Sequence, residues 1–149
     1  MHVLIATDGS EQSLEAARFL ESVVDPAKVT KVTVLAVVSP LAAVPFASDA
    51  EKGREPIEEM SFRRTAERAT EHVAVELRRW APEVATSVVG GSPSGEIVKA
   101  AVREQAGLIV VASRSSRTEA VLMGSVAHRV LNHADCPVLV WRTPAKPRR

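Results

Sequence analysis

Four short runs of the chain are almost continuously aliphatic, and they constrain the fold more than any other feature. They are HVLIAT (2–7), KVTVLAVV (31–38), GLIVVAS (107–113) and CPVLVW (136–141). A continuous apolar run is typical of a strand covered on both faces, whereas an alternating one has a face in water. EVATSVV (83–89) alternates and is predicted to be an edge strand. Together these runs predict a parallel sheet with helices on both sides.

Segments with helical periodicity separate the predicted strands. Ser10 is a predicted N-cap, because a serine side chain can accept from the first unpaired amides of a helix. Ser92 followed by Pro93 predicts another helix start, since proline fits the first helical position. A short helix is predicted after Gly124, and a longer one begins near Pro56. The apolar stripe of that longer helix consists of Phe62, Ala66, Ala69, Val73, Leu77 and Trp80.

Strands and helices alternate along the whole chain, which predicts an α/β fold. With 149 residues there is room for one domain, expected at residues 1–142, with a flexible tail at 143–149. The expected architecture is an open doubly wound sheet of five parallel strands, Rossmann-like, in the order 3-2-1-4-5. Residues 39–55 contain two prolines and no clean period, and are predicted to form a long loop.

The composition argues against several classes of partner. A net charge of +1 gives no global field for nucleic acid or a membrane surface, and 3% aromatic residues are few for a base-stacking platform. A single cysteine cannot form an internal disulfide. The N-terminus has no basic leader, and no apolar run approaches the roughly 18 residues of a membrane span. We therefore expect a soluble cytoplasmic protein that binds neither nucleic acid nor membrane.

Polar residues follow the first and fourth predicted strands. Open α/β sheets bind ligands at the carboxyl ends of their strands, where the winding reverses. If the first strand is central, that crevice brings ATDGS (6–10) opposite SRSSR (113–117). Asp8 can accept a hydrogen bond from a ribose or a base, while Arg114, Arg117, serines and backbone N–H groups can bind phosphate oxygens. This arrangement favours a nucleotide.

The sequence contains no recognised catalytic constellation. It lacks a G-x-x-x-x-G-K-[ST] loop, a G-x-G-x-x-G motif, a G-x-S-x-G elbow and an H-E-x-x-H pair. His128 and His133 lie off a common helical face, without partners at metal-binding spacing, and Cys136 is expected to be a packed thiol that starts the last strand. We expect a protein that is not an enzyme and needs no metal. The alternative is an adenylating or ATP-hydrolysing enzyme, because TDGS (7–10) shares part of a pyrophosphatase loop.

An ordered set of motifs resembles the universal stress protein family. That family carries Asp-Gly-Ser after the first strand, G-x-P-x-x-x-I at a helix start, an aliphatic fourth strand, a glycine loop ending in Gly-Ser, and a final C-P-V-L-V. This chain has ATDGSEQS, GGSPSGEIVKAA, GLIVVAS, MGSVAHRV and CPVLVW in the same order. The resemblance implies an adenine-nucleotide α-hydrolase-like fold and a non-catalytic stress-response or signalling protein that binds ATP or AMP.

The resemblance also implies candidate binding residues. Base and ribose would contact Ala6, Thr7 and Asp8, adenine would contact Val37, and phosphates would contact Gly124, Ser125 and Val126. The glycine loop departs from the family pattern in two respects. Ala112 and Ser115 replace its first two glycines, and eight residues rather than nine separate Ser115 from Gly124. A Cβ at these positions crowds a phosphate, whereas Arg114 adds positive charge beside it. We therefore expect ATP binding to be weak.

Simpler interpretations stay open for the same residues. Asp8 can serve only to cap the first helix together with Ser10. SRSSR can be a solvated loop, or a phosphorylation site at Ser113, Ser115 or Ser116. Given the altered loop, the domain can also be a nucleotide-independent interaction module.

The last predicted strand, CPVLVW, is expected to lie at a sheet edge, because no later segment remains to cover it. An apolar edge strand exposes unpaired N–H and C=O groups and is normally covered or paired. No charge interrupts the run before Arg142. The family resemblance implies antiparallel pairing of this strand with its copy across a two-fold axis. We expect a homodimer formed through Pro137–Trp141.

Overall fold

The computed structural model describes residues 1–39, 55–113 and 124–144, with the backbone alone described for 55–59. Its strands are β1 (His2–Ala6), β2 (Lys31–Val38), β3 (Val84–Gly90), β4 (Leu108–Ser113) and β5 (Val138–Arg142). Its helices are α1 (Glu11–Val23), α2 (Glu55–Leu77), α3 (Pro93–Arg103) and α4 (Ser125–His133), with a short 3-10 helix, η1, at Pro26–Lys28. The predicted loop at 39–55 and the predicted tail at 143–149 lie almost wholly outside the described residues.

The described strands form one sheet in the order β3-β2-β1-β4-β5, and every neighbouring pair is parallel. The chain passes from β1 outward to β2 and β3, then returns to the other side of β1 for β4 and β5. The winding therefore reverses at β1, which confirms the predicted doubly wound fold. The predicted edge positions of β3 and β5 are also confirmed.

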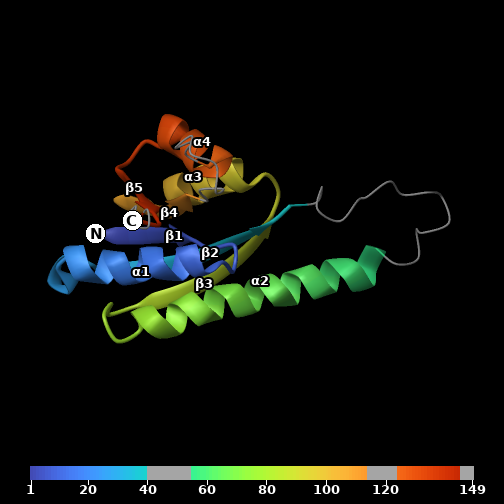
Figure 1. The fold of residues 1–149 in the computed structure, drawn as a ribbon, viewed down its shortest axis with the longest axis horizontal. Coiled ribbons are helices and arrows are strands. Elements are labelled where there is room, and N and C mark those ends of the chain that lie inside the picture. Colours follow the sequence, from blue (N-terminus) through green and yellow to red (C-terminus); the bar gives the residue numbers. More distant parts are fainter. Residues whose placement is uncertain (40–54, 114–123, 145–149) are drawn as a thin grey trace, which may run out of the picture.

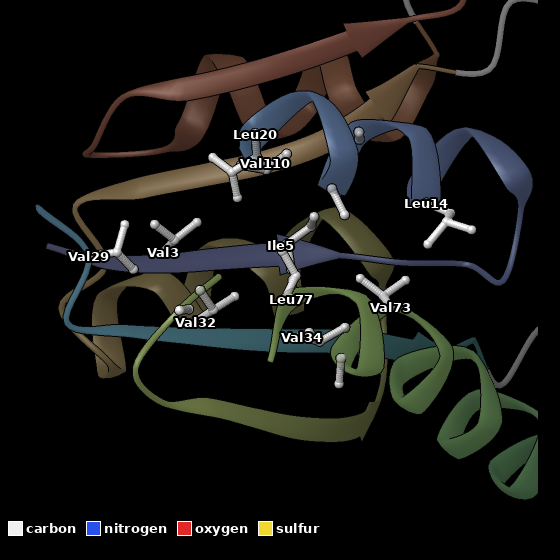
Figure 2. Packing of buried hydrophobic residues seen from close by; sticks show 14 residues of the cluster. Val3, Ile5, Leu14, Leu20, Val29, Val32, Val34, Val73, Leu77 and Val110 are labelled. Atoms are coloured by element: carbon white, nitrogen blue, oxygen red, sulfur yellow. The ribbon is translucent and has the colours of Figure 1, made fainter. Parts of the chain in front are cut away.

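Two layers of helices cover the sheet (Figure 1). α1 and α2 lie on one face, and α3 and α4 lie on the other. Side chains alternate between the faces along a strand, so the run at 3–6 fills both cores in turn. The core beneath α1 and α2, shown in Figure 2, includes the fully buried Val3, Ile5, Leu20, Val32, Leu77 and Val110. The opposite core includes Leu4, Leu35, Ile97, Ala100, Ile109 and Val130.

The first half of α2 departs from the predicted core stripe. Val73 and Leu77 are buried as expected, but Phe62 is 41% exposed and Ala66 is half-buried. A helix of 23 residues is about 35 Å long, whereas the eight residues of β2 span about 26 Å. The first turns of α2 therefore extend beyond the described strands of the sheet (Figure 1).

The last strand begins two residues later than predicted. Cys136 does not start it: β5 begins at Val138, and the half-buried Cys136 precedes it. Pro137 has no N–H to donate, but its carbonyl accepts from the N–H of Ile109 at 3.0 Å and so makes the first contact with β4. Burial raises the pKa of the Cys136 thiol, which keeps the thiol protonated at neutral pH.

Candidate functional site

A cavity of about 740 Å³ opens at the carboxyl ends of β1, β2 and β4, beside the strand where the winding reverses. Its walls come from the ends of these strands, from α2, and from the first turns of α1, α3 and α4. The sequence-predicted site residues that line it are Ala6, Thr7, Asp8, Val37, Ala112, Gly124, Ser125 and Val126. Arg114, Arg117, Ser115 and Ser116 lie outside the described residues. The fold thus brings eight of the nine candidates to one cavity.

Helix α2 contributes a wall that the sequence did not predict. Its lining residues are Phe62, Thr65, Ala66 and Ala69. The signal that could have found this wall is the change from large to small residues along the α2 stripe. A Cβ added to Gly9 would lie 3.4 Å from the Cβ of Ala69, so a larger residue on α2 would meet the β1–α1 turn.

A chain of hydrogen bonds holds the β1–α1 turn. The N–H of Gly9 donates to Thr7 Oγ1 at 3.1 Å, which lies 2.7 Å from Ser13 Oγ. Ser13 Oγ donates to the carbonyl of Ser10 at 2.8 Å, so the proton between the two hydroxyls belongs to Thr7. Gly9 has a φ of +80°, which glycine adopts at little cost. The hydroxyl proton of Thr7 is therefore used to fix the turn.

Asp8 contributes to the helix start and also lines the cavity. One of its oxygens accepts from the N–H of Ser10 at 2.9 Å, and Ser10 in turn caps α1 by accepting from the N–H of Ser13 at 3.3 Å. The predicted N-cap is confirmed. Among the described residues that line the cavity, Asp8 is the only ionisable one. This side of the cavity is therefore suited to groups that donate hydrogen bonds.

The N-terminus of α4 forms the opposite side of the cavity. No side chain caps this helix, and its first backward hydrogen bond runs from the N–H of His128 to the carbonyl of Gly124, at 2.9 Å. The N–H of Gly124 donates to Ser113 Oγ at 2.9 Å. The amides that follow, at 125–127, lie at the positive end of the helix dipole, where an anion is stabilised. Ser113 is 2% exposed, so its hydroxyl is not accessible for phosphorylation in the folded chain.

Apolar side chains separate the two polar sides. Val37 at the end of β2, Ile97 of α3 and Val111 of β4 all line the cavity. Leu35 and Ile97 belong to the core beneath α3 and α4, so this part of the wall is continuous with packed aliphatic residues. The cavity is therefore suited to a ligand with a flat apolar part, a hydroxyl-bearing part and an anionic part.

Other candidate groups lie outside this cavity. A smaller cavity of about 320 Å³, lined partly by Arg68 and His72, lies between the β1–α1 turn and α2. His72 is exposed, as predicted. The rings of His128 and His133 bond within α4, to Asn132 and to a backbone carbonyl. Within 1–39, 55–113 and 124–144, no three His, Cys, Asp or Glu residues gather in a metal-binding arrangement.

The fold and the cavity define an open α/β domain with a candidate ligand site at its topological switch point. Residues 1–142 match the Universal stress protein family. A curated relative, Universal stress protein MJ0531 of Methanocaldococcus jannaschii, is 34% identical over 146 residues, which cover 97% of this chain and 83% of that protein. The chain therefore belongs to the universal stress protein family, which confirms the assignment from its motifs.

Solved structures share the fold over nearly the whole chain. The structure of hypothetical protein MJ0577 superposes with a TM-score of 0.80 at 25% identity and covers 97% of each chain. The protein from Arabidopsis thaliana with AMP bound has a TM-score of 0.62 at 17% identity, over 97% of this chain and 93% of that one. The Archaeoglobus fulgidus protein in complex with dAMP has a TM-score of 0.58 at 22% identity, over 94% and 96%.

One further structure with this fold is a universal stress protein in complex with cAMP, with a TM-score of 0.61 at 23% identity, over 95% of this chain and 96% of that one. At these identities the three nucleotide complexes establish the likeness of the fold. Within the part of the chain that the structure describes, no helix combines the length and the apolar character needed to cross a membrane.

Proposed function

We propose that this universal stress protein binds an adenine nucleotide in the 740 Å³ cavity. The observation that carries the proposal is the separation of three chemistries within one cavity: Asp8 on one side, the apolar surface of Val37 and Ile97 between, and the α4 amides on the other side. A ribose, an adenine ring and a phosphate need these three surfaces. The relatives solved with cAMP, AMP and dAMP bind ligands of this class.

In this proposal each part of the nucleotide has a place. Adenine lies against Val37, the ribose hydroxyls lie near Ala6, Thr7 and Asp8, and the phosphate lies at the start of α4. ATP binds weakly in this proposal, because Ala112, which lines the cavity, carries a Cβ where the family pattern has a glycine. A loss of even ~3 kcal/mol would weaken ATP binding roughly a hundredfold relative to a family member with the glycines intact. Submicromolar ATP binding in calorimetric titration would contradict this.

The protein acts without catalysis, as a stress-response or signalling module in the cytoplasm, with neither nucleic acid nor membrane as a partner. Support comes from the cavity itself, where Asp8 is the single ionisable side chain among the described lining residues. Phosphoryl transfer relies mainly on cations that stabilise the charge on the phosphate, and no Lys, Arg or His is among the described residues that line this cavity. Release of ADP, AMP or pyrophosphate from ATP by the pure protein would favour the enzymatic alternative.

The protein forms a homodimer through the β5 edge. β5 pairs with β4 on one side, and an apolar edge strand is normally covered or paired. Light scattering during size exclusion should give about twice the chain mass of 16.0 kDa. Val138→Lys and Val140→Lys should shift the protein toward monomer, with circular dichroism as the control for folding. A stable wild-type monomer at micromolar concentration contradicts the dimer. If both lysine variants remain dimeric, the interface does not lie at β5.

The alternative is a nucleotide-independent interaction module. It is favoured by one observation, which is that Ser113 already occupies the N–H of Gly124 and leaves one amide fewer for a phosphate. The deciding experiment is to denature the purified protein, analyse the supernatant for nucleotides, and titrate the ligand-free protein with AMP and adenosine. Recovery or binding of an adenine nucleotide supports the proposed function. Failure to bind either compound supports the alternative.

A further inference from the structure

The buried hydroxyl of Ser113 makes a hydrogen bond just outside the proposed nucleotide site. Ser113 is the last residue of β4, is 2% exposed, and is not among the residues that line the cavity. Its Oγ accepts from the N–H of Gly124 at 2.9 Å. This hydrogen bond joins the end of a strand to the N-cap residue of α4, which does line the cavity.

Helix α4 has few other anchors near its start. It is nine residues long, its N-cap is a glycine with no side chain to cap it, and its buried residues are Ala127 and Val130. Val126, in the first turn, is 37% exposed. The small to medium side chains of Ala127 and Val130 pack into the core beneath α3 and α4. The hydrogen bond from Gly124 to Ser113 adds a directional contact between the start of the helix and the end of β4.

The hydrogen bond from Gly124 to Ser113 also affects which backbone amides are available to bind an anion. Gly124 donates its N–H to Ser113, and the first backward bond within the helix belongs to His128. The amides of residues 125–127 therefore have no backward partner within the helix. They lie at the positive end of the helix dipole, and residues 125–127 all line the cavity.

We propose that Ser113 is a positioning residue for the phosphate of the bound nucleotide. Its hydroxyl holds Gly124 so that the amides of Ser125 and Val126 are presented to the phosphate, and it does not contact the ligand. The inference rests on the proposed nucleotide function. It makes a specific claim, which is that Ser113 matters for a nucleoside monophosphate and not for the nucleoside alone.

The test compares AMP with adenosine, since the two differ only by the phosphate. Ser113→Ala should weaken AMP binding about fivefold to tenfold, the loss of roughly one well-placed hydrogen bond, and leave adenosine binding within about twofold. Ser113→Thr keeps the hydroxyl and should retain most of the AMP affinity. Thr33→Val is the matched control, because it removes a hydroxyl that is also 2% exposed in the same sheet, from a residue that does not line the cavity. It should leave the ratio of the two affinities unchanged.

Hydrogen exchange of the Gly124 amide, followed by NMR, reports on the bond without any ligand. The amide should be protected in the wild type and in Ser113→Thr, and should exchange faster in Ser113→Ala. Equal losses of AMP and adenosine affinity in Ser113→Ala would mean a general structural role, and a gain in AMP affinity would mean that Ser113 competes with the phosphate. Either result overturns the proposal, as does an unchanged AMP affinity. A wild type that binds neither compound overturns the proposed function itself, and with it this role.

Discussion

The two ends of the sheet are built in opposite ways. At the amino end, polar groups of the strands are hydrogen-bonded within the protein. His2 Nδ1 donates to the carbonyl of Glu104 at 3.0 Å, and the hydroxyl of Thr33 donates to Glu104 Oε2 at 2.7 Å. The amino group of Met1 donates to the carbonyl of Lys28 at 2.7 Å. At the carboxyl end, the strands finish in small residues around a cavity of about 740 Å³.

The difference follows from the direction of the chain. In a parallel α/β sheet the helices run back against the strands, so the helix N-termini, with their unpaired amides, gather at the carboxyl ends of the strands. Those amides can be used by a ligand, whereas polar groups at the amino end must be satisfied within the protein. We therefore expect the amino end to contribute mainly to stability and the carboxyl end to contribute to the proposed binding. Substitutions at the two ends should separate these two properties.

The largest effect is expected at the amino end. Glu104→Ala removes the carboxylate that accepts from the hydroxyl of Thr33, a residue 2% exposed, and leaves that hydroxyl with His2 Nε2 at 2.8 Å as its remaining partner. We expect a loss of about 2 kcal/mol in the free energy of unfolding by urea, with AMP affinity unchanged. The control is Glu83→Ala, which breaks an exposed ion pair with Lys31 at the same end and should cost no more than about 0.5 kcal/mol. Loss of AMP affinity without loss of stability would contradict the comparison.

The next effect is expected at the carboxyl end and has the opposite character. Asp8→Ala should weaken both adenosine and AMP at least tenfold, about 1.4 kcal/mol, because a ribose hydroxyl loses its acceptor. Stability should fall by less than this, since the hydrogen bond that the variant loses from the N–H of Ser10 is exposed to solvent. Titration calorimetry measures the binding, with Glu11→Ala as a charge-matched control. If the folded variant binds both compounds with unchanged affinity, Asp8 serves only to stabilise the start of α1.

A smaller effect is expected at the β1–α1 turn. Gly9→Ala places a Cβ on a residue with a φ of +80° and should cost about 1 kcal/mol of stability. Gly95→Ala is a matched control with the opposite sign, because Gly95 lies in α3 and an added Cβ there meets nothing closer than 3.8 Å. It should stabilise the protein by a few tenths of a kcal/mol to about 1 kcal/mol. Thermal unfolding of both variants measures these changes in stability. If both variants are destabilised, the positive φ of Gly9 does not explain its effect.

The smallest effect concerns a buried oxygen between α1 and α2. Glu21 Oε1 is buried with no hydrogen-bond partner among the described residues, and burial, together with the nearby Glu76 carboxylate, raises the pKa of Glu21. A raised pKa stabilises the fold below the ordinary glutamate pKa, and that stability is lost as the pH rises through the raised value. Glu21→Gln should therefore be more stable than the wild type at neutral pH, by a few tenths of a kcal/mol after screening by water. Urea unfolding at two pH values should show the difference vanish in acid.

Periodicity predicted most of the fold because strand and helix patterns are local properties of the sequence. The five strands and the N-cap at Ser10 follow from runs of aliphatic residues and their punctuation, whereas the strand order came from the winding rule for α/β sheets with the first strand taken as central. The start of β5 was predicted wrongly, since a pattern of apolar residues does not show where the ladder to β4 begins. The apolar stripe of α2 was predicted, but the exposure of Phe62 was not, because the stripe does not show where the sheet beside it ends.

The sequence by itself determined the fold class, the family and the end of the sheet where the candidate site lies, because each depends on residues close together in the chain or on the direction of parallel strands. Only the tertiary structure showed that α2 forms a wall of the cavity and that Ser113 accepts from Gly124. These contacts join residues far apart in the chain, through distances of a few ångström that depend on how the layers pack. No local pattern records such distances, so the details of the site were decided by packing.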